Sequence, residues 1–245
     1  MDERWAMAFE SGRGVSHGPV GMTVPLGRKV LVGREGDLPL GVQVPDPGVS
    51  RRAVEVTAVA EGWRIDIQNT NRAVLHAWGQ APILVTGEHL VTWPRAGLQV
   101  LSGDRPGTPN ARVHWLLLEA DSISVTPAGP RAGQASPSRT FSPEPPPPLT
   151  DEQEAAVRAV FAARLAWPPR LNAEPATLAS VARLLKISDS AVQERLKKVQ
   201  AKAVQLGLPR AGGLTDPDYV YTLVRDGYLA PPREHLPRTL QPWRG

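Results

Sequence analysis

The sequence predicts a multi-domain protein, an antiparallel all-β sandwich followed by a small all-α domain. Three observations predict this division. Apolar and polar residues alternate with period two before residue 125, eight prolines lie within residues 126–149, and the apolar period becomes helical from residue 150. We therefore assign residues 1–125 to the sandwich, 126–149 to a disordered proline-rich linker, and 150–245 to the helical domain.

Seven segments of the first domain have the pattern of β-strands, in which apolar and polar residues alternate and β-branched residues are frequent. Gly, Pro, Asn and Asp separate these segments at intervals of roughly ten residues, and no helical pattern intervenes. Short strands at this spacing are typical of a β-sandwich. The expected strands are residues 22–24, 29–32, 53–57, 63–67, 73–75, 98–101 and 113–118.

The linker has almost no apolar periodicity and contains the block Pro145-Pro146-Pro147-Pro148. Such a composition cannot bury enough apolar surface to offset the entropy cost of ordering the chain. We expect the proline block to be extended, at about 3.1 Å per residue.

Side-chain caps mark the helix starts of the second domain. Thr150 and Gln153 have the spacing of a capping box, and Thr177 and Ser188 precede two further apolar stripes. Prolines or glycines end three of the four helical segments, and Lys186-Ile187-Ser188 separates the second segment from the third. The expected helices are residues 150–167, 178–185, 189–206 and 216–225.

Composition excludes several classes of function. The chain has no cysteine, so disulfides, iron–sulfur clusters and cysteine-ligated zinc are ruled out, and its five histidines are too scattered to suggest a metal site. We find no nucleotide-binding glycine loop and no nucleophile elbow, and we expect neither an enzyme nor a cofactor. Without an apolar run long enough to span a bilayer, the protein is expected to be soluble and cytoplasmic.

Three short motifs follow or precede predicted strands of the first domain. Arg34 follows the strand 29–32, Ser50-Arg51 precedes the strand 53–57, and Thr70-Asn71 precedes the strand 73–75. In their order and spacing these motifs resemble those of the forkhead-associated (FHA) domain, a β-sandwich whose loops bind phosphothreonine peptides.

The chemistry of these residues suits a phosphate dianion, which prefers a guanidinium fork together with hydroxyl or backbone donors. The resemblance implies that Arg34, Ser50, Arg51 and Thr70 bind phosphate. It implies that Asn71, whose amide both donates and accepts, holds the main chain of the peptide. The expected partner is a phosphothreonine-containing protein, with a Ser/Thr kinase acting upstream.

This chain departs from the FHA pattern at two positions. Ala53 stands where the family has a histidine that braces the loops, three residues after the serine. Arg72 stands where glycine follows the Thr-Asn pair, and a left-handed backbone there would be resisted by its Cβ.

Residues 179–208 resemble a helix-turn-helix of the LuxR type, as found in bacterial regulators. Ala182 is small enough to let two helices approach, and Lys186 stands where the turn usually has glycine. The resemblance implies DNA binding by the outward face of the second helix, where four residues face base edges and two lysines meet phosphates. The candidate DNA-binding residues are Ser190, Gln193, Glu194, Lys197, Lys198 and Lys202.

Two functions remain open. The first is a transcriptional regulator in which the sandwich recognises a phosphothreonine protein and the helical domain binds DNA. Residues 150–245 carry 14 basic and ten acidic side chains, an excess too mild to decide the partner. The alternative is an adaptor whose helical domain binds a protein instead of DNA. The sequence leaves the oligomeric state unknown.

Overall fold

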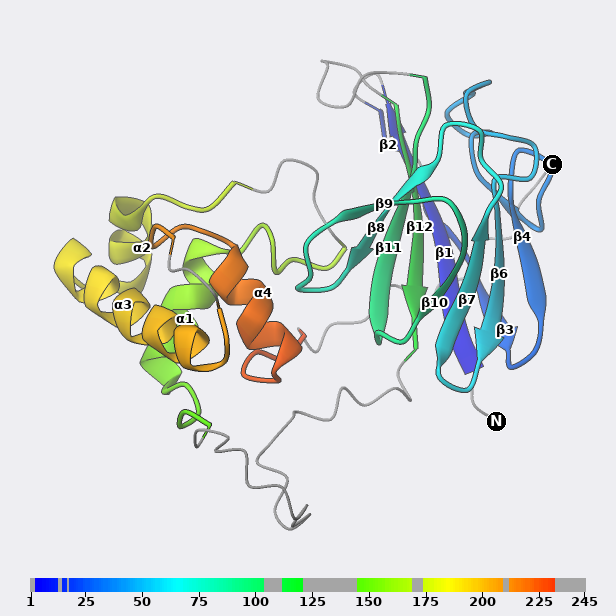
Figure 1. Cartoon of the computed structure of the whole chain (residues 1–245). Helices are drawn as coiled ribbons and strands as arrows, with labels where there is room; N and C mark the ends of the chain where they lie inside the picture. Colours follow the sequence, from blue (N-terminus) through cyan, green and yellow to red (C-terminus); the bar gives the residue numbers. More distant parts are fainter. Residues whose placement is uncertain are drawn as a thin grey trace, which may run out of the picture. The chain divides into compact units, whose positions relative to one another are not determined.

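The computed structural model of the 245-residue chain describes residues 3–12, 15–16, 18–103, 112–120, 145–168, 174–208 and 212–231. Most of these residues fall into two compact units, one of strands before residue 124 and one of helices after residue 125. We call them the sandwich unit and the helical unit (Figure 1).

The sandwich unit contains two β-sheets. In sheet A the strand order is β2-β1-β12-β11-β8-β9, and β3 also pairs with β1. Its strands are β1 (Glu3–Gly12), β2 (Val15–Ser16), β3 (Val20–Pro25), β8 (Ala73–Ala77), β9 (Ile83–Val85), β11 (Arg95–Val100) and β12 (Val113–Glu119). In sheet B the order is β10-β7-β6-β4-β5. Its strands are β4 (Lys29–Gly33), β5 (Leu38–Pro39), β6 (Val54–Val59), β7 (Gly62–Ile67) and β10 (Gly87–Val91).

Apolar side chains from both sheets form one core. Buried and half-buried residues alternate strictly along β6, as the period-two pattern predicts. Trp63, Val32, Leu98 and Leu118 belong to this core and are fully buried. The prediction of a β-sandwich is confirmed, and burial of these side chains is the main source of its stability.

All seven predicted strands are present, but five further strands were not predicted from the sequence. They are β1, β2, β5, β9 and β10. The strand β1 is the most consequential of these, because it pairs with β12 on one side and with β2 and β3 on the other.

The helical unit contains four helices among its described residues. They are α1 (Asp151–Val160), α2 (Leu178–Leu185), α3 (Asp189–Gln205) and α4 (Asp218–Arg225). The Thr150 capping box is present, and Thr177 and Ser188 cap α2 and α3 as predicted. The first helix is shorter than expected, because regular helix ends at Val160 and a turn then buries Phe161 and Leu165.

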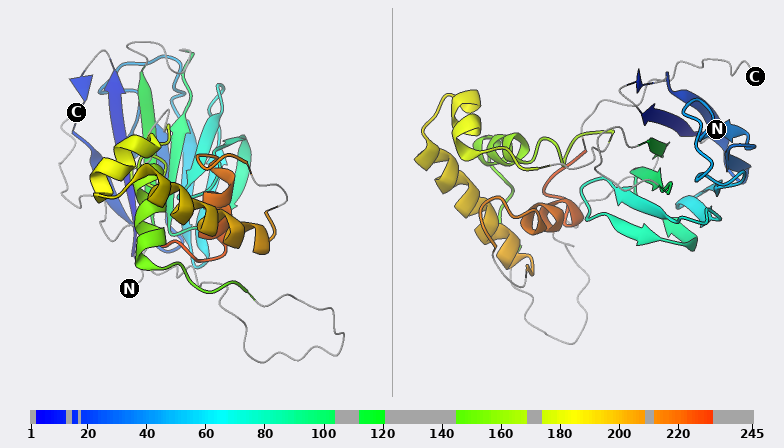
Figure 2. Two further views of the ribbon diagram at one scale, coloured as in Figure 1. Left: turned by 90° about the vertical axis from the view of Figure 1, so that its left-hand side faces the viewer. Right: turned by 90° about the horizontal axis from the view of Figure 1, so that it is seen from above.

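The helices α1, α2 and α3 pack on one another, and α4 packs on α3 (Figure 2). Their shared core contains Val157, Val192, Leu196 and Leu223, all fully buried. No helix in the described part of the chain is both long enough and apolar enough to cross a bilayer.

The end of the predicted linker belongs to the helical unit. Pro146 is buried and its carbonyl oxygen accepts from the Tyr228 hydroxyl, and Lys202 Nζ donates to the carbonyl oxygens of Pro147 and Pro148. These hydrogen bonds tie residues 146–148, which lie within the predicted linker, to the helical unit. The rest of the predicted linker, residues 126–144, lies outside the described residues.

Candidate functional site

The three predicted motifs lie on connections that meet at one end of the sandwich unit. The connections follow β4, precede β6 and follow β7, and they are the blue and cyan loops at the upper end of the sandwich in Figure 1. They meet because β4 and β7 both run antiparallel to β6.

Hydrogen bonds join the three loops directly. The backbone N–H of Arg34 donates to the carbonyl oxygen of Ser50 at 3.3 Å. The backbone N–H of Thr70 donates to the Ser50 hydroxyl at 3.3 Å, and Asn71 Nδ2 donates to the carbonyl oxygen of Gly48 at 2.9 Å. The residues predicted from separate motifs thus form one connected network.

The guanidinium of Arg34 is held by one edge only. Its Nε donates to the carbonyl oxygen of Val49 at 2.7 Å, while its two terminal nitrogens have no partner among the described residues. Gly33 is required just before it, because a Cβ at position 33 would lie 2.5 Å from the carbonyl oxygen of Arg51. The result is an exposed, oriented fork of donors.

Arg51 has a carboxylate neighbour in the same site. Its Nε lies 3.3 Å from Glu35 Oε1, and the two side chains are 71% and 62% exposed. An ion pair this exposed contributes about 0–1 kcal/mol, so a phosphate can displace Glu35 at little cost.

Asn69 holds the loops together and was missed by the sequence analysis. Its side chain is buried, with Oδ1 accepting from the Ser50 N–H at 3.0 Å. Its Nδ2 donates to the carbonyl oxygens of Arg72 and Leu101. Asn69 directly precedes the Thr-Asn pair, but the sequence does not show that its side chain is buried.

The two departures from the FHA pattern have different structural consequences. Ala53 is fully buried in the core, so position 53 offers no polar side chain to the loops. Arg72 adopts a left-handed backbone with φ 69°, as a glycine would, and remains exposed. This conformation costs a non-glycine residue roughly 1 kcal/mol, and it adds a cation beside the site.

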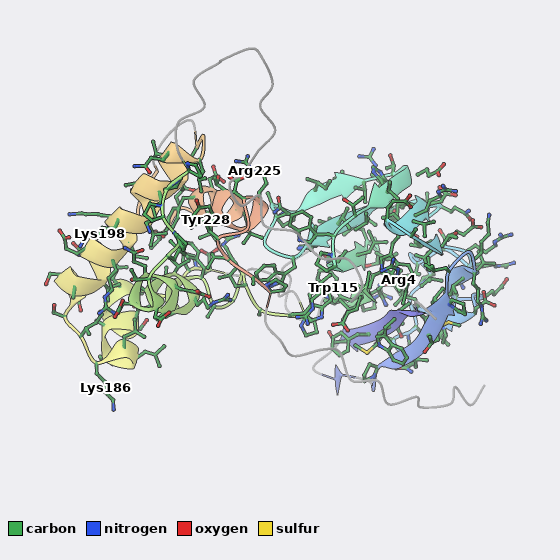
Figure 3. All side chains as sticks on the ribbon, turned by 90° about the horizontal axis from the view of Figure 1, so that it is seen from below. Arg4, Trp115, Lys186, Lys198, Arg225 and Tyr228 are labelled. Carbon is green, nitrogen blue, oxygen red and sulfur yellow. The ribbon has the colours of Figure 1, made fainter. Side chains whose placement is uncertain are left out.

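The predicted DNA-binding residues lie on α3. Ser190, Glu194, Lys197 and Lys198 are exposed and Gln193 is half-buried. Figure 3 labels Lys198 on this helix and shows Lys186 directed away from the turn between α2 and α3.

Lys202 differs from the other predicted DNA-binding residues. Its Nζ lies 2.9 Å and 2.6 Å from the carbonyl oxygens of Pro147 and Pro148, and partial burial lowers its pKa. The ammonium of Lys202 thus anchors the proline block in this structure, and its predicted role in DNA binding stays a prediction.

The turn between α2 and α3 is tight. Lys186 is left-handed, with φ 55° and ψ 43°, and its N–H donates to the carbonyl oxygen of Ala182. Ser188 then accepts from the Ala191 N–H and starts α3. The glycine-like backbone at Lys186 thus ends α2, and α3 begins three residues later.

No group of three or more His, Asp or Glu side chains within the described residues has a geometry that could hold a metal ion. No family model and no curated protein matches the chain.

Several solved structures of FHA domains are similar to the N-terminal half of the chain. An FHA domain of a Chlamydia trachomatis protein is 11% identical, with a TM-score of 0.31, over 46% of this chain and 95% of that chain. An FHA domain of a Mycobacterium tuberculosis protein is 15% identical, with a TM-score of 0.26, over 46% and 95%.

A third similar structure comes from work on phosphothreonine-dependent FHA domain interactions. It is 17% identical, with a TM-score of 0.29, over 47% of this chain and 95% of that chain. Because these TM-scores lie below 0.5, assignment of the site depends on its own residues and geometry.

Proposed function

We propose that the loop end of the sandwich unit binds phosphothreonine peptides in the manner of an FHA domain. The observation that carries the proposal is the hydrogen-bonded network that brings Arg34, Ser50, Thr70 and Asn71 together from three loops. Each of these residues was predicted from sequence motifs. In each, one polar group keeps a donor or acceptor position without a hydrogen-bond partner among the described residues and can therefore bind a ligand.

The phosphate would lie between Arg34 and Ser50. The terminal nitrogens of Arg34 present two parallel donors, which match two phosphate oxygens. The Ser50 hydroxyl accepts from Thr70, so its hydrogen is available to donate to a third oxygen. Arg51 adds a second cation when the phosphate displaces Glu35.

The peptide main chain would bind at Asn71. Its Nδ2 is fixed on the carbonyl oxygen of Gly48, which orients Oδ1 to accept from a peptide N–H. The amide nitrogen fixes the position of the Asn71 side chain, and the amide oxygen binds the peptide main chain. The peptide is thereby held in register with the phosphate.

This function is tested with fluorescein-labelled nonapeptide pools carrying a central phosphothreonine, phosphoserine or threonine between degenerate flanks. The whole chain is expected to bind the phosphothreonine pool more than about 100-fold more tightly than the threonine pool, since two or more charge-assisted hydrogen bonds depend on the phosphate. Fluorescence anisotropy measures both affinities. Equal binding of these two pools, or no binding, contradicts the proposal, and the phosphoserine pool measures how much of the affinity depends on the threonine methyl group.

A second candidate function is DNA binding by the helical unit, which would make the protein a transcriptional regulator acting downstream of a Ser/Thr kinase. The tight turn at Lys186, the Ser188 cap and the exposed Lys197 and Lys198 on α3 favour it. The alternative is an adaptor, in which this unit binds a protein instead of DNA.

Replacing Lys197 and Lys198 together by Ala separates these two functions. If α3 meets DNA phosphates, the variant is expected to reduce the slope of log K against log salt by about two, because each neutralised phosphate contributes about 0.9. A salt titration of the whole chain on random duplex DNA measures the slope.

The matched control for this titration removes two cations from the sandwich unit, Arg28→Ala with Lys29→Ala, both at exposed positions. Absence of DNA binding at low salt, or an equal loss of slope in the control, would leave the adaptor as the function of the helical unit.

A further inference from the structure

A buried charged cluster lies beneath the phosphate-binding loops. His114 on β12 is fully buried, with Nδ1 3.0 Å from Glu10 Oε1 and Nε2 3.0 Å from Asp46 Oδ2. Arg112 Nε lies 3.3 Å from the same Asp46 oxygen. Ionised carboxylates only accept hydrogen bonds, so an imidazole placed between two of them carries a hydrogen on both nitrogens.

The two carboxylates hold the segment 41–49, which precedes Ser50. Glu10 accepts from the backbone N–H groups of Gly41 and Val44, the latter at 2.9 Å. Burial opposes the ionisation of Glu10, but hydrogen bonds from His114 and from these two amides outweigh it and lower its pKa. Asp46 Oδ1 accepts from the Gly48 N–H at 2.8 Å.

Two carbonyl groups near the C-terminal end of the 41–49 segment hold the side chains of two binding residues. The carbonyl oxygen of Gly48 accepts from Asn71, and that of Val49 accepts from Arg34. A continuous set of hydrogen bonds thus links His114, through Asp46, to the residues that would touch peptide and phosphate.

We propose that His114 is a positioning residue for phosphopeptide binding, its doubly protonated ring fixing the 41–49 segment by bridging Glu10 and Asp46. The inference rests on the proposed function of the loops. It gives the site a brace from β12 where position 53, occupied by Ala53, has no polar side chain.

The test compares wild type with His114→Gln, using the whole chain and the phosphothreonine peptide pool. The variant is expected to bind about 10-fold more weakly at pH 7, where the phosphate is mostly a dianion because its second pKa is about 6. His89→Gln is the control, since the ring of His89, on β10, hydrogen-bonds among the described residues only to the carbonyl oxygen of Thr86.

Two measurements on wild type keep the proposal falsifiable if the variant does not fold. Nitrogen-15 NMR of the imidazole is expected to show both ring nitrogens of His114 protonated, and a neutral ring would overturn the proposal. Amide hydrogen exchange at Gly41, Val44 and Gly48, corrected for intrinsic rates, is expected to be slow, because these amides donate to buried carboxylates. Exchange of these amides at the rate of an unstructured segment would also overturn it, as would His114→Gln with wild-type affinity.

These measurements distinguish failure of the positioning role of His114 from failure of the proposed phosphopeptide binding. Absence of phosphothreonine binding by wild type contradicts the function of the loops, whereas the NMR and exchange data report on the brace without any peptide.

Discussion

Arg34→Ala is expected to weaken phosphothreonine-peptide binding by about 100-fold. Two charge-assisted hydrogen bonds from its terminal nitrogens are lost, each contributing about 1.5 kcal/mol or more, and about 3 kcal/mol corresponds to this change in Kd. The fork is oriented in advance by the bond from Nε to Val49, so little side-chain entropy is lost on binding. Arg34→Lys keeps the charge but not the fork, and should recover only part of the affinity.

Anisotropy titrations of the phosphothreonine pool measure these effects. Glu35→Gln is the informative comparison, because it removes the carboxylate that competes for Arg51 and should tighten binding a few-fold. Arg28→Ala removes an equal charge at the turn after β3 and should change little. Wild-type affinity in the Arg34 variant would exclude the proposed site.

Asn69→Ala is expected to lower the free energy of unfolding of the sandwich unit by about 3 kcal/mol. The side chain makes three hydrogen bonds, and its removal leaves the N–H of Ser50 and the carbonyl oxygens of Arg72 and Leu101 without their partner. Each buried group left unsatisfied costs about 1 kcal/mol or more. In a unit of this size the melting temperature should fall by roughly 10 °C or more.

Differential scanning calorimetry measures this loss of stability. Gln68→Ala is the matched control, since the side chain of the adjacent Gln68 is exposed and hydrogen-bonds among the described residues only to Asp66. Equal melting temperatures for the two variants would show that the Asn69 hydrogen bonds do not stabilise the loops.

The site residues predicted from sequence are those whose chemistry is visible within a short motif. Arg34, Ser50, Thr70 and Asn71 each stand beside a strand end, and the sheet topology brings these ends together. Their supports could not be predicted in this way. His114 lies 104 residues from Glu10, and its importance depends on burial between two carboxylates.

The unpredicted strands share a similar cause. The strand β1 is buried along most of its length, so it lacks the alternation that marks a half-buried strand, and it contains no β-branched residue. β9 has three residues, too few to establish a period. The starts of α1, α2 and α3 were predicted accurately because caps are local, whereas the docking of Pro146 on Tyr228 joins residues 82 apart.

The connection from β7 to β8 leaves sheet B and enters sheet A, and it carries Thr70 and Asn71. A ligand that contacts both this crossover and Arg34 would therefore bind only when the two sheets are assembled. Thermodynamic linkage then couples occupancy to folding, and peptide at one hundred times its Kd adds about 2.7 kcal/mol to the stability of the sandwich unit. The population of folded sandwich would thus rise with the concentration of the phosphorylated partner.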